Sequence, residues 1–83
     1  MTGKSVADAV RDARMRLGLS VRQLAPRVRK SNGLRIGASY VTDIEKGRGI
    51  PSEYVAGELA RALSMDVDAF SALCMSQRSR RTS

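Results

Sequence analysis

Apolar side chains recur along this 83-residue chain at intervals of three and four positions, which is the spacing of the buried face of an amphipathic helix. The first such segment begins after Ser5, a good helix-capping residue, and ends at Gly18. Its expected buried face consists of Val6, Val10, Ala13 and Leu17. The pattern predicts an N-terminal helix with one face turned to a core.

A second helical segment begins after Ser20. Pro26 lies inside it, where proline removes an internal hydrogen bond and should bend the helix. The Asn32-Gly33 pair is a strong turn signal. We therefore expect this helix to continue to about Ser31, to turn there and to lead through an extended Arg35-Ile36. Its expected inward residues are Val21, Leu24, Ala25 and Val28.

Residues 37–52 read GASYVTDIEKGRGIPS and predict a short third helix that ends abruptly on glycine. Gly37 suits the N-cap, and Val41 and Ile44 have the spacing of an inward-facing pair. Gly47 supplies the left-handed residue that stops the helix. The outer face of this helix, over about residues 38–46, is small and polar.

Two further helices complete an all-α, five-helix fold. The fourth begins at Ser52, directly after Pro51, and the fifth is capped by Asp66 or Asp68. Because residues 76–83 are polar, basic and without periodicity, we expect a disordered tail after a single domain of residues 1–75. The expected buried residues are Val55, Ala56, Leu59 and Leu63 in the fourth helix and Phe70, Leu73 and Cys74 in the fifth.

The distribution of charge along the sequence indicates what kind of partner the protein binds. The chain has 15 Lys and Arg against 8 Asp and Glu, a net charge of +7. Residues 11–35 hold eight cations and one acid, Asp12, whereas residues 52–70 hold four acids and only Arg61. One end of the molecule is therefore expected to attract a polyanion such as nucleic acid. The alternative is an arginine-rich surface that is simply solvated.

Several classes of function are disfavoured by residues that the chain lacks. It has one cysteine, Cys74, and no histidine, so one chain can form neither a disulfide nor the usual zinc and His-based nucleophilic sites. We expect no enzyme activity, no metal and no cofactor. No apolar run approaches the roughly 18 residues of a membrane span, and the N-terminus lacks a signal-peptide core. This predicts a cytoplasmic, nucleoid-associated protein with no membrane partner.

The run YVTDIEKG at residues 40–47 fits the pattern Y-[IV]-x-x-[IL]-E-x-G. This pattern is typical of the recognition helix in the Cro and phage-repressor type helix-turn-helix, the XRE family. GLSVRQLA at residues 18–25 resembles that family's entry into its second helix, and residues 51–63 resemble its fourth. The resemblance covers about residues 8–73. In one departure, Leu24 and Tyr40 are separated by about six positions more than a tight turn allows, so residues 29–34 look inserted.

The resemblance implies base contacts from the outward N-terminal part of the third helix, at Ala38, Ser39 and Asp43, with Thr42 nearby. Ala38 suits a thymine methyl group, Ser39 suits either kind of base, and Asp43 can accept from a cytosine amino group. None of these is the long bidentate side chain that discriminates most strongly between bases. Asp43 has an alternative role as a local charge on the helix face.

The resemblance also implies phosphate contacts from Ser20, Lys46 and Arg48. The family often has Gln directly after the helix cap, whereas this chain has Val21. Tyr40 is expected to pack with its hydroxyl facing phosphate. The cations that can compensate for the missing Gln are Arg22, Arg29, Lys30 and Arg35. Those of the inserted segment have the alternative of forming a solvated loop.

Arg14 and Glu45 fall on the positions where similar proteins join the first helix to the end of the recognition helix. We therefore expect a structural salt bridge between them. If the pair is buried, removing one partner would cost about 3–5 kcal/mol. An exposed pair would contribute less than about 1 kcal/mol.

The resemblance thus implies a sequence-specific transcriptional regulator, a repressor that binds a two-fold operator in double-stranded DNA as a homodimer. The third helix would enter the major groove. The alternative is an antitoxin that regulates itself through the same helices while another surface binds a toxin. Phe70, Leu73 and Met75 are candidates for the dimer face, although they could equally close the core.

Overall fold

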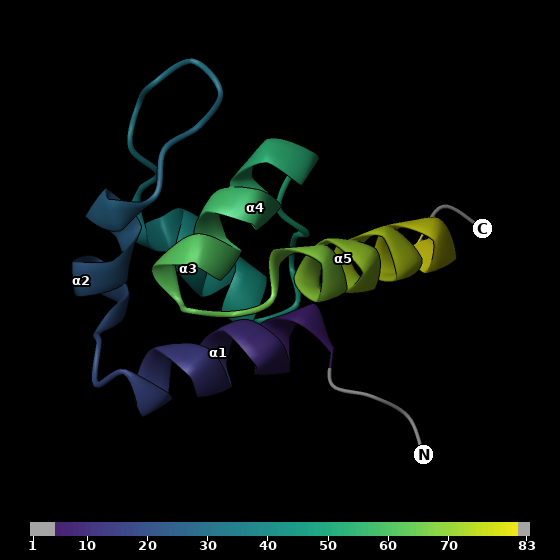
Figure 1. Cartoon of the computed structure of the whole chain (residues 1–83), viewed down its shortest axis with the longest axis horizontal. Coiled ribbons are helices and arrows are strands. Elements are labelled where there is room, and N and C mark those ends of the chain that lie inside the picture. The colour runs from purple at the N-terminus through teal and green to yellow at the C-terminus, as the bar shows by residue number, and fades with distance from the viewer. Residues whose placement is uncertain (1–4, 82–83) are drawn as a thin grey trace.

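A computed structural model describes residues 5–81 of the chain. These residues form an all-α fold, as predicted, in which α4 and α5 pack against each other and α1 packs against α3 and α5. Figure 1 shows α1 along one side of the molecule and α2 at one end, with α5 extending toward the other. The helices are α1 (Val6–Arg16), α2 (Val21–Leu24), α3 (Ala38–Glu45), α4 (Glu53–Ala62) and α5 (Val67–Arg81), and a short 3₁₀ turn, η1 (Ala25–Arg27), follows α2.

The helices begin where the sequence predicts. The side chains of Ser5, Ser20 and Ser52 each accept a hydrogen bond from the backbone N–H three residues later, which satisfies a donor that the helix leaves unpaired. Asp66 rather than Asp68 caps α5, because its carboxylate accepts from the N–H of Ala69 at 3.0 Å. Gly37 precedes α3 as its N-cap.

The core contains apolar side chains from all five helices of the described chain. Phe70 is 2% exposed, so it closes the core, whereas Met75 is 58% exposed. Leu17 is 43% exposed and does not belong to the buried face of α1, which corrects the predicted stripe. The reason is local: α1 ends at Arg16, and Gly18, with φ +70°, turns the chain away from the helix direction.

The second helix is shorter than expected. It ends at Leu24 and tightens into the 3₁₀ turn that contains Pro26, and Val28 is already extended, so the predicted continuation to Ser31 is wrong. Proline has no N–H to continue the α-helical bonding, which explains the change. Residues 28–36 instead form a hairpin, which we call the inserted hairpin, with an antiparallel bridge between Arg29 and Arg35. In Figure 1 it is the loop that projects above α2.

The fifth helix is longer than expected. It runs to Arg81, so the predicted disorder is wrong over residues 76–81, while residues 82 and 83 lie outside the described part of the chain. Two contacts explain the order. The side-chain carbonyl of Gln77 accepts from the N–H of Val6, and the Arg78 guanidinium donates to the Pro51 carbonyl at 2.7 Å. The C-terminal turns of α5 are therefore fastened to the start of α1 and to the segment before α4.

Candidate nucleic-acid interface

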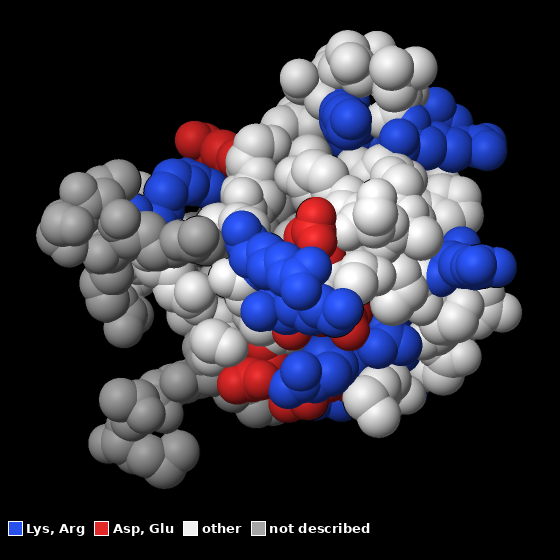
Figure 2. Space-filling view, turned by 180° about the vertical axis from the view of Figure 1, so that it is seen from behind, with Lys and Arg blue, Asp and Glu red and all other residues white. Residues whose placement is uncertain are grey.

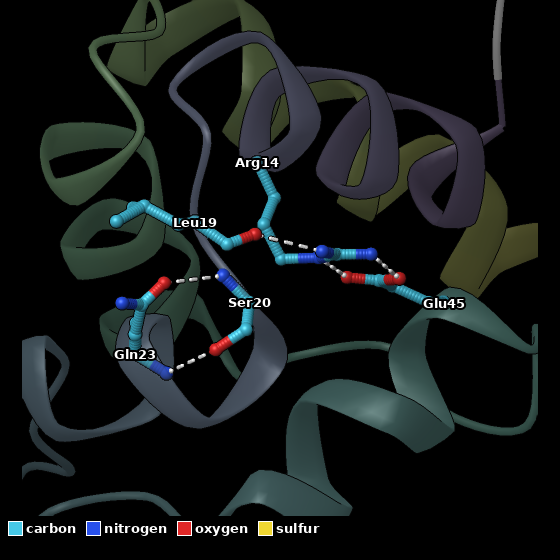
Figure 3. Close-up of polar contacts among 5 residues, drawn as sticks. All are labelled: Arg14, Leu19, Ser20, Gln23 and Glu45. Atoms are coloured by element: carbon cyan, nitrogen blue, oxygen red, sulfur yellow. Dashed lines mark hydrogen bonds and ion pairs between the residues drawn. The ribbon is translucent and has the colours of Figure 1, made fainter.

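One arginine joins α1, α3 and the turn that leads into α2. The Arg14 guanidinium donates to both carboxylate oxygens of Glu45, from Nε at 2.6 Å and from a terminal nitrogen at 2.9 Å. Its other terminal nitrogen donates to the Leu19 carbonyl at 2.8 Å. Figure 3 shows the guanidinium lying between these two partners. The predicted salt bridge is confirmed, and we call this arrangement the Arg14–Glu45 latch.

The latch is largely shielded from solvent. The side chains of Arg14 and Glu45 are 15% and 10% exposed. The hydrogen bonds from Arg14 to Glu45 raise the pKa of the guanidinium above its ordinary value, so the arginine is charged at physiological pH. Because a bidentate pair restricts both distance and orientation, the latch fixes how the end of α3 packs against α1.

The start of α2 is fixed directly beside the latch. The Ser20 hydroxyl accepts from the N–H of Gln23, and the Gln23 side chain accepts from the N–H of Ser20 at 2.8 Å. This reciprocal capping box satisfies two backbone donors at once and is visible in Figure 3. The latch and the capping box together hold α2 and α3 in a defined relation.

The exposed face of α3 carries the residues predicted to contact bases. Val41 and Ile44 are buried, while Ser39 and Asp43 are exposed and Ala38 and Thr42 are half-buried. No side chain caps α3, in contrast with α1, α2 and α4. The helix α3 thus presents a short polar face to solvent, while its opposite face is buried in the core.

The turn after α3 brings a cation back toward the helix. Gly47, with φ +76°, reverses the chain, and the N–H of Arg48 donates to the Asp43 carbonyl at 2.9 Å. The Arg48 guanidinium then lies 3.9 Å from the Asp43 carboxylate, and both side chains are more than half exposed. This weak pair partly offsets the negative charge of Asp43. Lys46 is also exposed at this end of α3.

A comparison with known families decides what kind of domain this is. Residues 5–73 match the model of the family described as "Helix-turn-helix domain". The chain belongs to the helix-turn-helix domain family. No curated protein matches the chain in sequence. In a helix-turn-helix, the second of two successive helices is the one that enters the DNA major groove.

Within this helix-turn-helix, the predicted phosphate-contacting residues lie on several elements. Ser20 and Arg22 are exposed at the start of α2, and Lys46 and Arg48 are exposed after α3. Tyr40 is half-buried and packs against the core, as the packing part of its predicted role requires. The remaining predicted residues, Arg29, Lys30 and Arg35, are exposed on the inserted hairpin, which leads into α3.

Positive charge is visible on the face of the molecule opposite to the one seen in Figure 1. Figure 2 shows Lys and Arg side chains at the base of the projecting loop and in a group across the middle of the face, with a few carboxylates beside them. The cations on this face are therefore separated by acids and by uncharged residues, and they do not form a uniform positive patch.

The sequence did not reveal that residues 28–36 form a hairpin. The signal was present, because Asn32-Gly33 is a typical hairpin turn pair and is flanked by the apolar Val28 and Ile36. Both of these flanking side chains are buried, at 0% and 3% exposure. A hairpin with its base in the core could therefore have been predicted from the apolar residues on either side of the turn.

The described residues were also compared with what a metal site, a reactive thiol and a membrane-spanning helix require. Residues 5–81 hold no group of three or more His, Cys, Asp or Glu side chains that could bind a metal ion. Cys74 is buried, and loss of solvation raises the pKa of its thiol to about 11, so the thiol is neutral at physiological pH and a poor nucleophile. No helix in this part of the chain is long and apolar enough to cross a membrane.

Proposed function

We propose that this helix-turn-helix protein is a sequence-specific DNA-binding transcriptional regulator of the Cro and phage-repressor type, with α3 in the major groove. The observation that carries the proposal is the Arg14–Glu45 latch, which holds α3 at a fixed angle with its polar face outward. Reading base edges requires such rigidity, since a displacement of about 1 Å breaks the hydrogen bonds that discriminate between bases.

The base-contacting residues of the proposal are Ala38, Ser39, Thr42 and Asp43. Ser39 and Asp43 are the more exposed of these. They are short side chains, so the helix must approach the base pairs closely to use them. Each good contact would contribute about 1–3 kcal/mol of discrimination, and the small size of Ala38 removes a steric obstacle to that approach.

The phosphate-contacting residues of the proposal flank α3 in space. Ser20 and Arg22 stand at the start of α2, and Lys46 and Arg48 stand at the end of α3, with the Tyr40 hydroxyl as a further donor. These residues would grip the two strands that border the groove. Such contacts position α3 on the duplex and carry no sequence information of their own.

A homodimer on a two-fold operator completes the proposal, with repression as the consequence of occupying that site. The physical argument is the size of the reading surface. α3 has eight residues, and only its outward face reads bases, so one copy contacts few base pairs. Two copies on adjacent half-sites double the contacts, and their joint affinity rises far above that of one domain.

Selection of bound duplexes from a random DNA pool, followed by sequencing, tests this function. The proposal predicts an enriched consensus with two-fold symmetry and half-sites about one helical turn apart. Lys46→Ala and Arg48→Ala should weaken binding to all sequences alike and lower the salt dependence, because each phosphate contact releases about 0.9 counterion equivalents. A pool that shows no enriched sequence after repeated rounds would contradict sequence-specific regulation.

A further inference from the structure

The inserted hairpin is a fixed structure. Val28 and Ile36 hold its base in the core, and the N–H of Ile36 donates to the Val28 carbonyl at 3.0 Å. Further out, Arg29 and Arg35 form the antiparallel bridge, and the N–H of Lys30 donates to the Leu34 carbonyl at 2.7 Å. The hairpin is thus anchored at one end and projects from the helical body at the other, as Figure 1 shows.

The tip of the hairpin is organised by its own hydrogen bonds. Gly33 adopts φ +87°, a backbone conformation that favours glycine, and its N–H donates to the Lys30 carbonyl at 2.9 Å. The Asn32 side chain accepts from the N–H of Leu34, and the Arg29 guanidinium donates to the Gly33 carbonyl. Because the turn is formed in the free protein, a partner that binds it has little ordering entropy to overcome.

The charges on the hairpin repel one another. Arg29 and Arg35 are directly opposite across the antiparallel bridge, so their side chains leave the same face, where like charges are destabilising. The sequence has no acid between Asp12 and Asp43. Within the described residues, no ion pair neutralises Arg29, Lys30 or Arg35. A bound anion between the two arginines would relieve this repulsion.

We propose that the inserted hairpin is a second DNA-binding arm, in which the Arg29 and Arg35 face holds a sugar–phosphate strand beside the groove that α3 enters. The inference rests on the proposed function, because it uses the same duplex. The hairpin runs directly into the N-cap of α3 through Ile36, so Arg35 lies only three residues before Ala38, the first residue of α3, and Arg29 is opposite Arg35 across the bridge. Guanidinium groups suit phosphate because they donate in a bidentate manner.

This assignment gives the two arginines different tasks. Arg29 already donates one hydrogen bond to the tip, so it both supports the turn and offers its remaining N–H groups to phosphate. Arg35 has no such bond within the described chain and is the freer of the two. The arm would lengthen the stretch of backbone that one copy covers without adding any contact to a base.

Salt titration of binding tests the arm. Affinity for a mixed-sequence duplex is measured between about 50 and 200 mM salt for the wild type, the Arg29→Gln/Arg35→Gln variant and the single Arg35→Gln variant. The slope of log affinity against log salt should fall by about 0.9 for the single variant and by about 1.8 for the double variant. Hydroxyl-radical footprinting should show a protected backbone patch that the double variant loses.

Two controls separate local contact from overall charge. Arg61→Gln removes the same charge from the outer surface of α4, beside Glu58, and should leave the slope unchanged. Arg35→Lys keeps the charge and should retain the slope. An unchanged slope and footprint in the double variant would overturn the arm, as would an equal loss in Arg61→Gln. If Lys46 and Arg48 variants lose affinity while the hairpin variants do not, only the arm is wrong. If the wild type binds no duplex, the proposed function is wrong as well.

Discussion

The Arg14–Glu45 latch and the inserted hairpin use arginine in opposite ways. In the latch, one guanidinium is 15% exposed, and it makes three hydrogen bonds to a carboxylate and a carbonyl. On the hairpin, Arg29 and Arg35 are exposed, face the same side and have no acid nearby in the sequence. The shielded arginine of the latch holds α3 in place, whereas the exposed arginines of the hairpin have no acid to neutralise them and are the ones that we propose bind DNA. Net charge alone does not distinguish these roles.

The largest expected effect lies at the latch. Glu45→Ala leaves the Arg14 guanidinium mostly buried with only the Leu19 carbonyl as a partner, so unfolding free energy should fall by about 3–5 kcal/mol. Urea unfolding measures this loss. The matched control is Glu58→Ala, which removes a carboxylate from the more exposed pair with Arg61 and should cost less than about 1 kcal/mol. Equal losses in the two variants would show that the latch is not a special contact.

The second largest expected effect on stability distinguishes the buried base of the hairpin from its exposed outer part. Ile36→Ala removes a buried side chain and should lower the unfolding free energy by about 2–5 kcal/mol. Leu34→Ala, two residues earlier, removes a side chain that is 62% exposed and should change it by less than about 0.5 kcal/mol. Urea unfolding of both variants compares them. A large loss in Leu34→Ala would mean that the outer hairpin packs on the helical body.

A smaller effect tests whether the turn is preformed. Gly33→Ala places a side chain at φ +87° and should cost about 1–2 kcal/mol. Amide exchange at Ile36, whose N–H bonds to the Val28 carbonyl, reports on the hairpin directly and should become faster. Exchange that stays at the wild-type rate would contradict a turn that depends on glycine.

The smallest expected effect is a gain in stability, in contrast with the losses expected for the variants above. Gly57 lies inside α4 without a positive φ, and an added Cβ would meet Val67 Cγ1 at 3.9 Å, an ordinary contact. Gly57→Ala should therefore raise the unfolding free energy by about 0.5–1 kcal/mol through helix propensity. Thermal unfolding measures it beside Gly33→Ala. Destabilisation by Gly57→Ala would indicate that α4 needs a closer approach at this residue than the fold shows.

The sequence predicted what local rules control. Ser5, Ser20 and Ser52 begin helices because their side chains bond to donors only three residues away. The Arg14–Glu45 pair was predicted from family resemblance, since no spacing along the chain indicates that residues 31 positions apart will meet. The DNA-contacting residues come from the same resemblance and stay predictions.

The errors occurred where distant contacts override the local pattern. The polar segment after Ser76 shows no helical period, yet Gln77 and Arg78 bond to Val6 and Pro51, residues 71 and 27 positions away. The predicted continuation of the second helix failed for a different reason. Val28 and Ile36 both enter the core, and two extended segments joined by a turn allow this more directly than a helix that Pro26 interrupts.

The most direct test compares the DNA sequences selected by two double variants and by the wild type. If α3 reads bases and the inserted hairpin grips the backbone, Ser39→Ala/Asp43→Ala should change the selected consensus while keeping the salt dependence. Arg29→Gln/Arg35→Gln should select the wild-type consensus with a shallower salt dependence. The contradictory result is an unchanged consensus in the α3 variant together with a changed consensus in the hairpin variant, since the hairpin would then be the element that reads the sequence.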